Sequence, residues 1–183
     1  MFTKKFTRRV FLKTALAGAL TLGGGTTAFA KTLLADRGSL SLYNTHTKER
    51  LSVIYRNQDS TYDVDALQAI NRILRCHYTN QQTVMDVNTI EYLNLVDKRL
   101  GGGNEIHIIS GYRSPAYNTL LLSQNQHVAR HSLHLAGKAI DMSIPGIELR
   151  TVRNTAAALQ LGGVGYYPGE GFVHIDSGNV RTW

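Results

Sequence analysis

Two imidazoles and one carboxylate, carried on two short stretches of the chain, have the types and spacing of a hydrolytic metal site. His134 and Asp141 lie within residues 131–141, and His174 lies within the later run 172–176. Catalytic zinc usually takes three protein ligands of the His and Asp/Glu type and leaves the fourth position to water, whereas structural zinc is enclosed by four ligands rich in cysteine. The chain has a single cysteine, Cys76, so a cysteine-based structural site is excluded.

The chemistry expected of such a site is hydrolysis of an amide. Zinc lowers the pKa of a bound water to roughly 7 and polarises the carbonyl group of a substrate. Addition of water then puts negative charge on the carbonyl oxygen. Arg113, close behind the β-prone run 105–110 and Gly111, offers a permanently charged fork of donors that can stabilise this oxyanion or pair with a substrate carboxylate. Tyr112 and Ser132 are further candidates for substrate contact.

The residue that accepts a proton from water is less clearly marked. Asp176 is expected on the same strand face as His174, about 6 to 7 Å along the strand, as a general base or as a partner that orients the imidazole. Glu170, in a glycine-flanked turn, and His131, three residues before His134, are alternatives. The sequence therefore leaves three candidates for the base, with a weak preference for Asp176.

A rival metal set also has to be weighed. His127, His131 and His134 have spacings of four and three residues, which would place them on one face of a helix. Ser132 and Gly137 indicate that such a helix ends before His134. We therefore favour His134, Asp141 and His174 as the ligands of one zinc ion per chain.

The elements that must position these residues can be read from periodicity and capping. The polar segment 44–50 between two β-prone runs predicts a hairpin, and apolar residues at helical spacing after Asp63 predict a capped helix. The expected elements before the motif are the strands 40–43 and 51–55, helices over 63–77 and about 89–100, the strand 105–110, and a polar helix over about 116–129.

Alternation predicts where the carboxylate points. From residue 138 onward, Ala139, Asp141 and Ser143 share one strand face, which faces a cleft lined by small or polar groups. A helix over about 147–161 follows, then the glycine-rich run 162–167, a turn over 168–171 and a final strand over 172–176. If the two strands pair as neighbours, His174 and Asp141 meet across the sheet, and His134 arrives from the adjoining loop.

The amino terminus has the features of an export signal. Arg8 and Arg9 precede a mild apolar segment, and the tripeptide 28–30 is a small-residue cleavage pattern, so residues 1–30 resemble a twin-arginine signal peptide and 31–183 form the mature domain. The apolar run is interrupted by glycines and is shorter than the ~20 residues needed to span a bilayer. We expect recognition by the twin-arginine export machinery and no stable membrane insertion after cleavage.

Without the leader, the strong positive charge disappears. Residues 1–30 carry 5 of the 20 basic residues and none of the 13 acidic ones, which leaves 15 basic against 13 acidic residues in the mature chain. Nucleic-acid binding calls for a concentrated basic face, so the composition gives it little support. A mature chain of this length has no repeat or linker and fits one domain with its own core.

The motif Ser-x-His-x-x-Gly-x-Ala-x-Asp, present as residues 132–141, resembles that of the LAS metallopeptidases, which include D-Ala-D-Ala carboxypeptidases, VanX dipeptidases and the amino-terminal domain of sonic hedgehog. Within that group the chain is most similar to the MepK (YcbK-type) murein endopeptidases. The similarity rests on the runs 110–114, 162–168 and 172–176, on the terminal Trp183 and on the twin-arginine leader.

The resemblance implies a single α+β domain of the Hedgehog/DD-peptidase type, with a small antiparallel sheet and flanking helices. It implies a periplasmic, zinc-dependent hydrolase of peptidoglycan cross-links between stem peptides, with His134, Asp141 and His174 as ligands and Arg113 near the scissile carbonyl. VanX-type enzymes have a glutamate three residues before the last histidine, where this chain has Gly171. Alternatives are therefore a noncatalytic zinc-containing wall-binding module, a carboxypeptidase or a dipeptidase. The resemblance favours diaminopimelate–diaminopimelate links.

Overall fold

The computed structural model describes residues 37–124 and 128–183. The predicted leader, residues 1–30, lies outside the described residues. Among the helices of the described ranges, none is both long enough and apolar enough to cross a bilayer.

A seven-stranded mixed sheet organises the domain, in the order β2-β1-β3-β4-β6-β5-β7. The α+β class is as predicted, but the sheet is larger than expected and not purely antiparallel, because β1 pairs with β3 and β5 with β7 in parallel. The strands are β1 (Gly38–Asn44), β2 (Arg50–Arg56), β3 (Glu105–Ser110), β4 (Ala139–Ser143), β5 (Gly163–Tyr167), β6 (Phe172–Asp176) and β7 (Arg181–Thr182).

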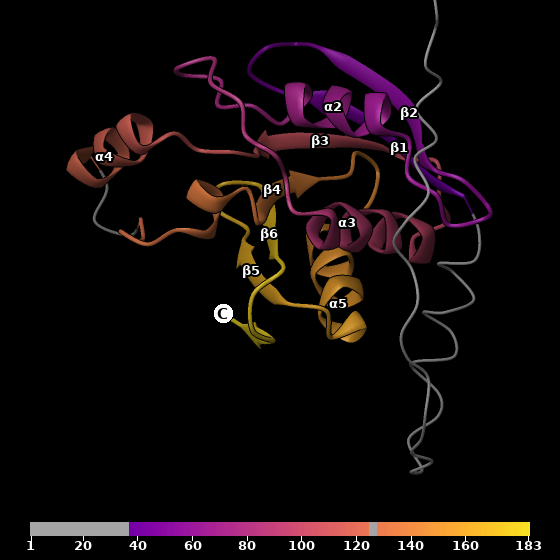
Figure 1. Ribbon diagram of the computed structural model, residues 1–183. Coiled ribbons are helices and arrows are strands. Elements are labelled where there is room, and N and C mark those ends of the chain that lie inside the picture. Colours follow the sequence, from indigo (N-terminus) through magenta and orange to yellow (C-terminus); the bar gives the residue numbers. More distant parts are fainter. Residues whose placement is uncertain (1–36, 125–127) are drawn as a thin grey trace, which may run out of the picture.

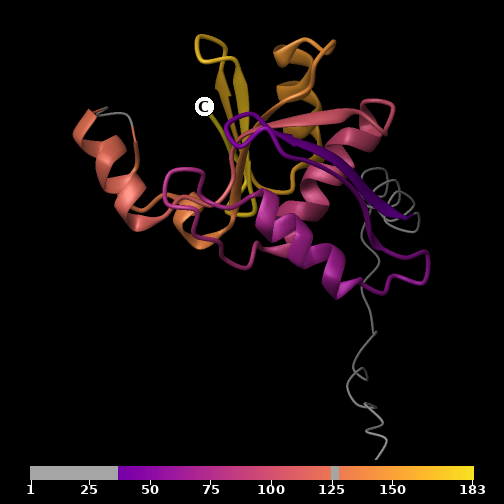
Figure 2. The ribbon, with the colours of Figure 1, turned by 90° about the horizontal axis from the view of Figure 1, so that it is seen from above.

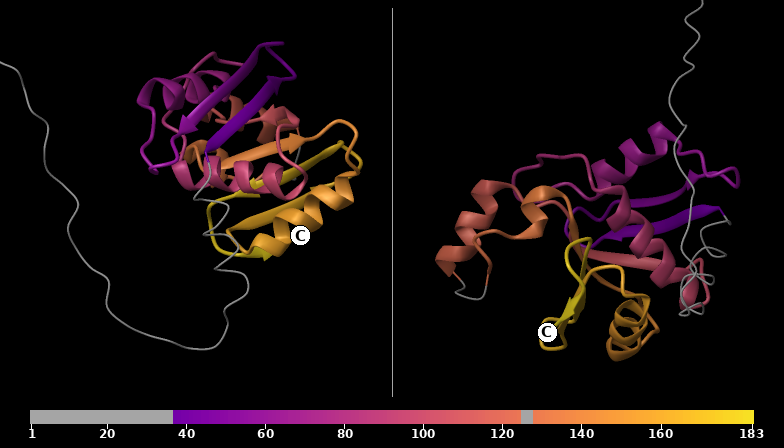
Figure 3. Two further views of the ribbon diagram at one scale, coloured as in Figure 1. Left: turned by 90° about the vertical axis from the view of Figure 1, so that its right-hand side faces the viewer. Right: turned by 60° about the horizontal axis from the view of Figure 1, so that its bottom comes forward.

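Helices lie on both sides of the sheet. The helices α3 (Val87–Arg99) and α5 (Leu149–Leu159) lie on one side of β4, β5 and β6, and α4 (Pro115–Gln124) lies on the other (Figures 1 and 3). Figure 2 shows α4 standing out from the body of the domain. The remaining helix, α2 (Val64–Ile73), packs on the β1–β2 hairpin.

One hydrophobic core joins the sheet to α2, α3 and α5. The strand residues Ile140 and Ile175 are fully buried in it, together with Ile70 of α2, Val96 of α3 and Val152 of α5. Because alternate residues of a strand point to opposite faces, burial of this apolar face of β4 and β6 directs Asp141 and His174 to the other face. The core therefore fixes the side of the sheet on which the polar residues gather.

The helix boundaries follow the caps. The Asp63 side chain accepts a hydrogen bond from the Ala66 N–H at the start of α2, as the sequence indicated. Asp86 caps α3, which therefore begins a little earlier than predicted, and α3 ends before the glycine run 101–103. The helix expected over 116–129 is described only to Gln124, and residues 128–129 are not helical.

Candidate metal centre

The two strand residues of the site face each other across one antiparallel pair. Asp141 of β4 is directly opposite His174 of β6 in the register, which confirms the predicted pairing of these strands. Neighbouring residues at such positions have Cβ atoms about 4.5 to 5.5 Å apart, so their side chains can share an ion.

His134 reaches the same point from a short 3-10 helix, η1 (Leu133–Ala136). The Ser132 side chain caps η1 by accepting a hydrogen bond from the His134 N–H, and Gly137 ends it with φ of 66°. A left-handed backbone at that position favours glycine, because a Cβ atom would be strained there. The turn predicted after His134 is thus present.

Three potential ligand side chains converge in a buried cluster. His174 Nδ1 lies 2.8 Å from Asp141 Oδ1, His134 Nε2 lies 3.2 Å from Asp141 Oδ2, and the two imidazole nitrogens are 3.3 Å apart. Within residues 37–124 and 128–183, this is the one group of three ligand-type side chains close enough to hold an ion together.

The hydrogen bonds behind the imidazoles determine which nitrogens carry protons. His134 Nδ1 lies 2.7 Å from the Gly111 carbonyl oxygen, and His174 Nε2 lies 3.0 Å from Asp176 Oδ2. Both oxygens only accept, so in each neutral ring the proton sits on the outer nitrogen. In the neutral rings the inner nitrogens, beside the Asp141 carboxylate, are then the ones available to bind an ion. Three acceptors aimed at one point, with oriented imidazoles, fit a divalent cation such as zinc.

The electrostatics of the cluster keep Asp141 charged. Burial alone would raise the pKa of Asp141, but the charges and hydrogen bonds of His134 and His174 hold it well below the ordinary value. Burial also acts to lower the pKa of His174, and hydrogen bonds to Asp141 and Asp176 outweigh it and raise that pKa. Asp141 is therefore the anionic group of the cluster at neutral pH.

Arg113 lies beside the Asp141 carboxylate. One guanidinium nitrogen, Nη2, lies 3.6 Å from Asp141 Oδ2, and the backbone N–H of Arg113 donates to the His134 carbonyl at 3.1 Å. Its Nε is buried and makes no hydrogen bond to the described residues. Because this ion pair is long and Arg113 lines the cleft, its guanidinium is able to bind a substrate oxygen.

Asp176 lies behind His174, on the far side of the ring from Asp141. Its Oδ2 accepts from His174 and from Arg181 Nη2 at 2.7 Å, and its Oδ1 accepts from the N–H groups of Gly163 and Gly178 at 3.1 and 2.8 Å. The side chain is fully buried. This position suits a residue that orients His174, and it does not support the preferred role as a base, because both oxygens are already engaged.

An open cleft of about 600 Å3 lies over the cluster. Its walls come from Arg113, the segments 128–134 and 167–174, and the residue after β7. The lining residues are Arg113, Val128, Ala129, Ser132, His134, Asp141, Tyr167, Glu170, Phe172, His174 and Trp183.

The other sequence candidates divide between the cleft and elsewhere. Ser132 and Glu170 line the cleft, as candidates for substrate contact and proton transfer should. Tyr112 does not: it packs against the core and its N–H donates to the Leu74 carbonyl, so its predicted contact with substrate is not supported. His131 is exposed and is not among the lining residues, and His127 lies outside the described residues.

Three aromatic residues of the cleft had no predicted role. Tyr167, Phe172 and Trp183 line it, and the sequence marks them only as parts of the runs that carry the family resemblance. A usable signal was the pair Gly163 and Gly165, which leaves one face of β5 without side chains for larger neighbours to cover.

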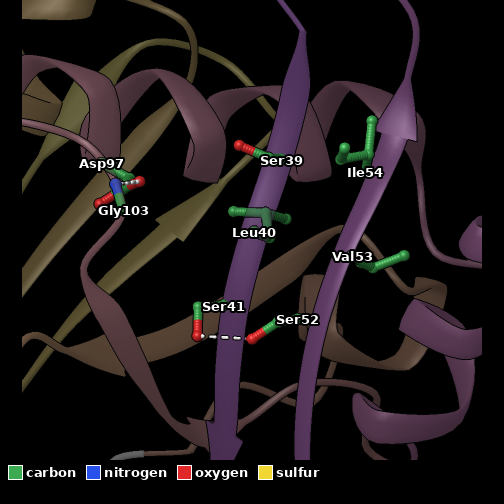
Figure 4. Close-up of a pocket in the computed structure, with 8 residues that line it drawn as sticks. All are labelled: Ser39, Leu40, Ser41, Ser52, Val53, Ile54, Asp97 and Gly103. Atoms are coloured by element: carbon green, nitrogen blue, oxygen red, sulfur yellow. Dashed lines mark hydrogen bonds between the residues drawn. The ribbon is translucent and has the colours of Figure 1, made fainter.

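A second hollow, of about 520 Å3, lies on the β1–β2 hairpin. Figure 4 shows the hydroxyl and aliphatic side chains that line it, with Asp97 and Gly103 at its margin. The Asp97 carboxylate already accepts hydrogen bonds from the N–H groups of Gly103 and Asn104. This hollow therefore has no set of groups for hydrolysis comparable with that of the cleft.

The fold and the site define an α+β protein with a candidate hydrolytic metal centre. A family model described as "Peptidoglycan L,D-endopeptidase MepK" matches residues 33–183, and the chain belongs to this family. This confirms the resemblance inferred from the motifs.

Two curated relatives cover most of the chain. A Haemophilus influenzae protein named "Probable peptidoglycan L,D-endopeptidase MepK" is 39% identical over 145 residues, which are 79% of this chain and 77% of that protein. The peptidoglycan L,D-endopeptidase MepK of Escherichia coli K12 is 34% identical over 169 residues, which are 91% of this chain and 92% of that protein. The similarity thus extends over more than three quarters of each chain.

Proposed function

We propose that the chain is a zinc-dependent peptidoglycan L,D-endopeptidase that hydrolyses peptide cross-links between stem peptides in the periplasm. The names of the relatives support the substrate and the L,D bond class, and the family resemblance favours links between two diaminopimelate residues. The zinc assignment rests on the convergence of three ligand side chains. Hydrogen bonds to Gly111 and Asp176 hold the two imidazoles among them in one tautomer.

In this proposal His134, Asp141 and His174 hold one zinc ion. When bound, zinc polarises the scissile carbonyl group and lowers the pKa of a coordinated water. The negative Asp141 carboxylate and the two neutral imidazoles leave net positive charge at the ion, which suits attack on an amide.

Arg113 is assigned to stabilise negative charge on the substrate. Its guanidinium donates hydrogen bonds to the oxyanion of the tetrahedral intermediate or to the carboxylate next to the scissile amide nitrogen. The position of Arg113 in the wall of the cleft and its long contact to Asp141 support this role. Ser132, which also lines the cleft, is assigned to substrate contact.

Glu170 is assigned to proton transfer, and Asp176 to positioning. Of the three candidates for the base, Glu170 is the one that lines the cleft. It accepts a proton from the attacking water and returns it to the amine that leaves. Asp176 keeps the Nδ1 lone pair of His174 directed at the ion, because its Oδ2 accepts a hydrogen bond from the protonated Nε2 on the other side of the ring.

The location follows from the substrate and the leader. Peptidoglycan lies outside the cytoplasm, and Arg8 and Arg9 begin the predicted twin-arginine signal of residues 1–30. We propose export in the folded state, cleavage after Ala30 and action of the mature domain, residues 31–183, on the wall. Replacement of both arginines by lysine should leave the precursor in the cytoplasm, detected by fractionation.

The test is digestion of defined cross-linked muropeptides by the purified mature chain, with products identified by mass. Conversion of diaminopimelate-linked dimers to monomers, abolished by a chelator and restored by zinc, is the expected result. Release of single D-alanine would identify a carboxypeptidase instead. Bound zinc without reaction on any muropeptide would favour a wall-binding module and contradict the proposal.

A further inference from the structure

The end of the chain places an indole ring at the cleft. Trp183 follows β7, and its backbone exchanges hydrogen bonds with β5, from Trp183 N–H to the Val164 carbonyl at 3.2 Å and from Tyr166 N–H to Trp183 O at 3.0 Å. The ring centroids of Trp183 and His174 are 5.4 Å apart, and Trp183 is 50% exposed. A half-exposed indole therefore lies against a candidate zinc ligand.

Two glycines on β5 make room for this arrangement. Gly165 is opposite His174 in the register, and a Cβ atom on it would lie 2.7 Å from a ring carbon of Tyr167 and 2.8 Å from one of Trp183. On the same face, a Cβ atom on Gly163 would lie 2.5 Å from Arg181 Nη1. Real side chains do not approach so closely. Tyr167, Trp183 and Arg181 can therefore cover this face of β5 only because Gly163 and Gly165 have no side chains.

Polar contacts hold the indole in one orientation. Its Nε1 donates to the Tyr167 hydroxyl oxygen at 2.8 Å, and the Arg181 guanidinium lies 4.8 Å from the ring centroid, itself fixed by a hydrogen bond to Asp176. Tyr167 in turn stacks on Phe172 at 4.7 Å between ring centroids. The three rings form a preorganised aromatic wall, made of Tyr167, Phe172 and Trp183.

The cleft is consequently asymmetric. In the strand order β3-β4-β6-β5-β7, Arg113 follows β3 and Trp183 follows β7, so they flank the β4–β6 pair that carries Asp141 and His174. Arg113 contacts Asp141, whereas Trp183 lies beside His174. One side of the candidate metal centre is thus cationic and the other is aromatic.

We propose that the aromatic wall is the subsite for the methylene chain of the diamino acid whose carbonyl is attacked. This inference rests on the proposed function and adds its specificity. With the developing oxyanion or the amine-side carboxylate at Arg113, the side chain of the acyl residue lies along Trp183 and Tyr167. A diaminopimelate side chain buries several methylene groups there, whereas D-alanine offers one methyl group. The wall therefore selects diaminopimelate over D-alanine on the acyl side of the cross-link.

The first test compares two synthetic cross-linked dimers that differ only in the acyl residue, diaminopimelate or D-alanine. Trp183→Ala should lower kcat/KM for the diaminopimelate dimer by about tenfold or more, with little effect on the D-alanine dimer and on zinc content. Gly165→Ala should act in the same direction, because the added methyl group displaces the indole. Melting temperatures of the zinc-loaded variants confirm that they are folded.

The second test does not depend on turnover. Trp183 is the only tryptophan of the chain, so the intrinsic emission of the zinc-loaded protein reports on this wall alone. An uncleavable analogue, with a reduced scissile bond and diaminopimelate at the acyl position, should change the emission saturably, and the D-alanine analogue should not.

The outcomes separate the subsite from the activity. Equal losses on both dimers, or an analogue that inhibits hydrolysis without changing the emission, would overturn the subsite and leave the endopeptidase assignment intact. Hydrolysis of neither dimer, with no emission change from either analogue, would overturn both.

Discussion

Replacement of Asp176 by asparagine separates the two roles that the sequence left open for this carboxylate. Its Oδ2 accepts from His174 and Arg181, and its Oδ1 accepts from the N–H groups of Gly163 and Gly178. Asparagine preserves the shape but turns one accepting oxygen into an NH2 group. Whichever way the amide is oriented, its NH2 group then faces N–H groups that need an acceptor, in a fully buried site.

The size of the effect differs between the two roles. A buried donor left without an acceptor costs about 1 to 3 kcal/mol, and partners of metal-binding histidines typically change metal affinity roughly 10- to 100-fold when replaced. If Asp176 positions His174, Asp176→Asn should bind zinc about 10- to 100-fold more weakly, while kcat at saturating zinc falls by less than about 100-fold. A general base would instead lower kcat by about 10² to 10⁴ with zinc affinity unchanged.

The assay pairs zinc affinity, from competition with a chromophoric chelator, with kcat on the diaminopimelate dimer at saturating zinc. Asp97→Asn is a matched control, since Asp97 is also a buried carboxylate that accepts from backbone N–H groups, on α3 and outside the cleft. It should lose stability but keep the zinc affinity of the wild type. Unchanged zinc affinity in Asp176→Asn, together with a collapse of kcat, would refute the positioning role.

Substitutions at three further residues test the roles of single side chains. Arg113→Gln should lower kcat by about 10² to 10³ without loss of zinc, and Arg113→Lys should restore little, because a lysine lacks the planar fork; an unchanged kcat would contradict the assignment. Glu170→Gln should lower kcat by about 10² to 10⁴ without loss of zinc, whereas a kcat close to that of the wild type would exclude Glu170 as the base. Burial, then the positive charges of His46 and Arg113, lower the pKa of His77 from 6.5 to about 4, so the unfolded chain takes up this proton more readily and stability falls as the pH drops from 6.5 toward 4. Because the His77 imidazole is partly exposed and screened by solvent, His77→Phe should remove only about 1 kcal/mol of this fall in urea unfolding, and identical pH dependence in both proteins would contradict it.

The parts of the site that local patterns determine could be predicted from the sequence. Alternation in β4 and β6 assigned Asp141 and His174 to one face, because a strand repeats every two residues and its apolar face must be buried. The cap Ser132 and the left-handed Gly137 likewise delimit the turn that carries His134.

The parts that depend on distant segments could not. Arg181 and Trp183 reach the site through β7, a strand of two residues that is too short to show a period. Nothing in the local sequence therefore indicates that Arg181 binds the Asp176 carboxylate, and the sequence alone favours Asp176 as the base. A register irregularity in β3 between Ile108 and Ser110 prevents its alternation from being extended to Tyr112, which turns to the core.

The most direct test of the central claim is a crystal structure of the zinc-loaded mature chain with anomalous data at the zinc edge. We predict a single anomalous peak about 2.0 to 2.2 Å from His134 Nε2, His174 Nδ1 and an oxygen of Asp141. A zinc ion bound elsewhere, with these three side chains left out of its coordination, would contradict the account.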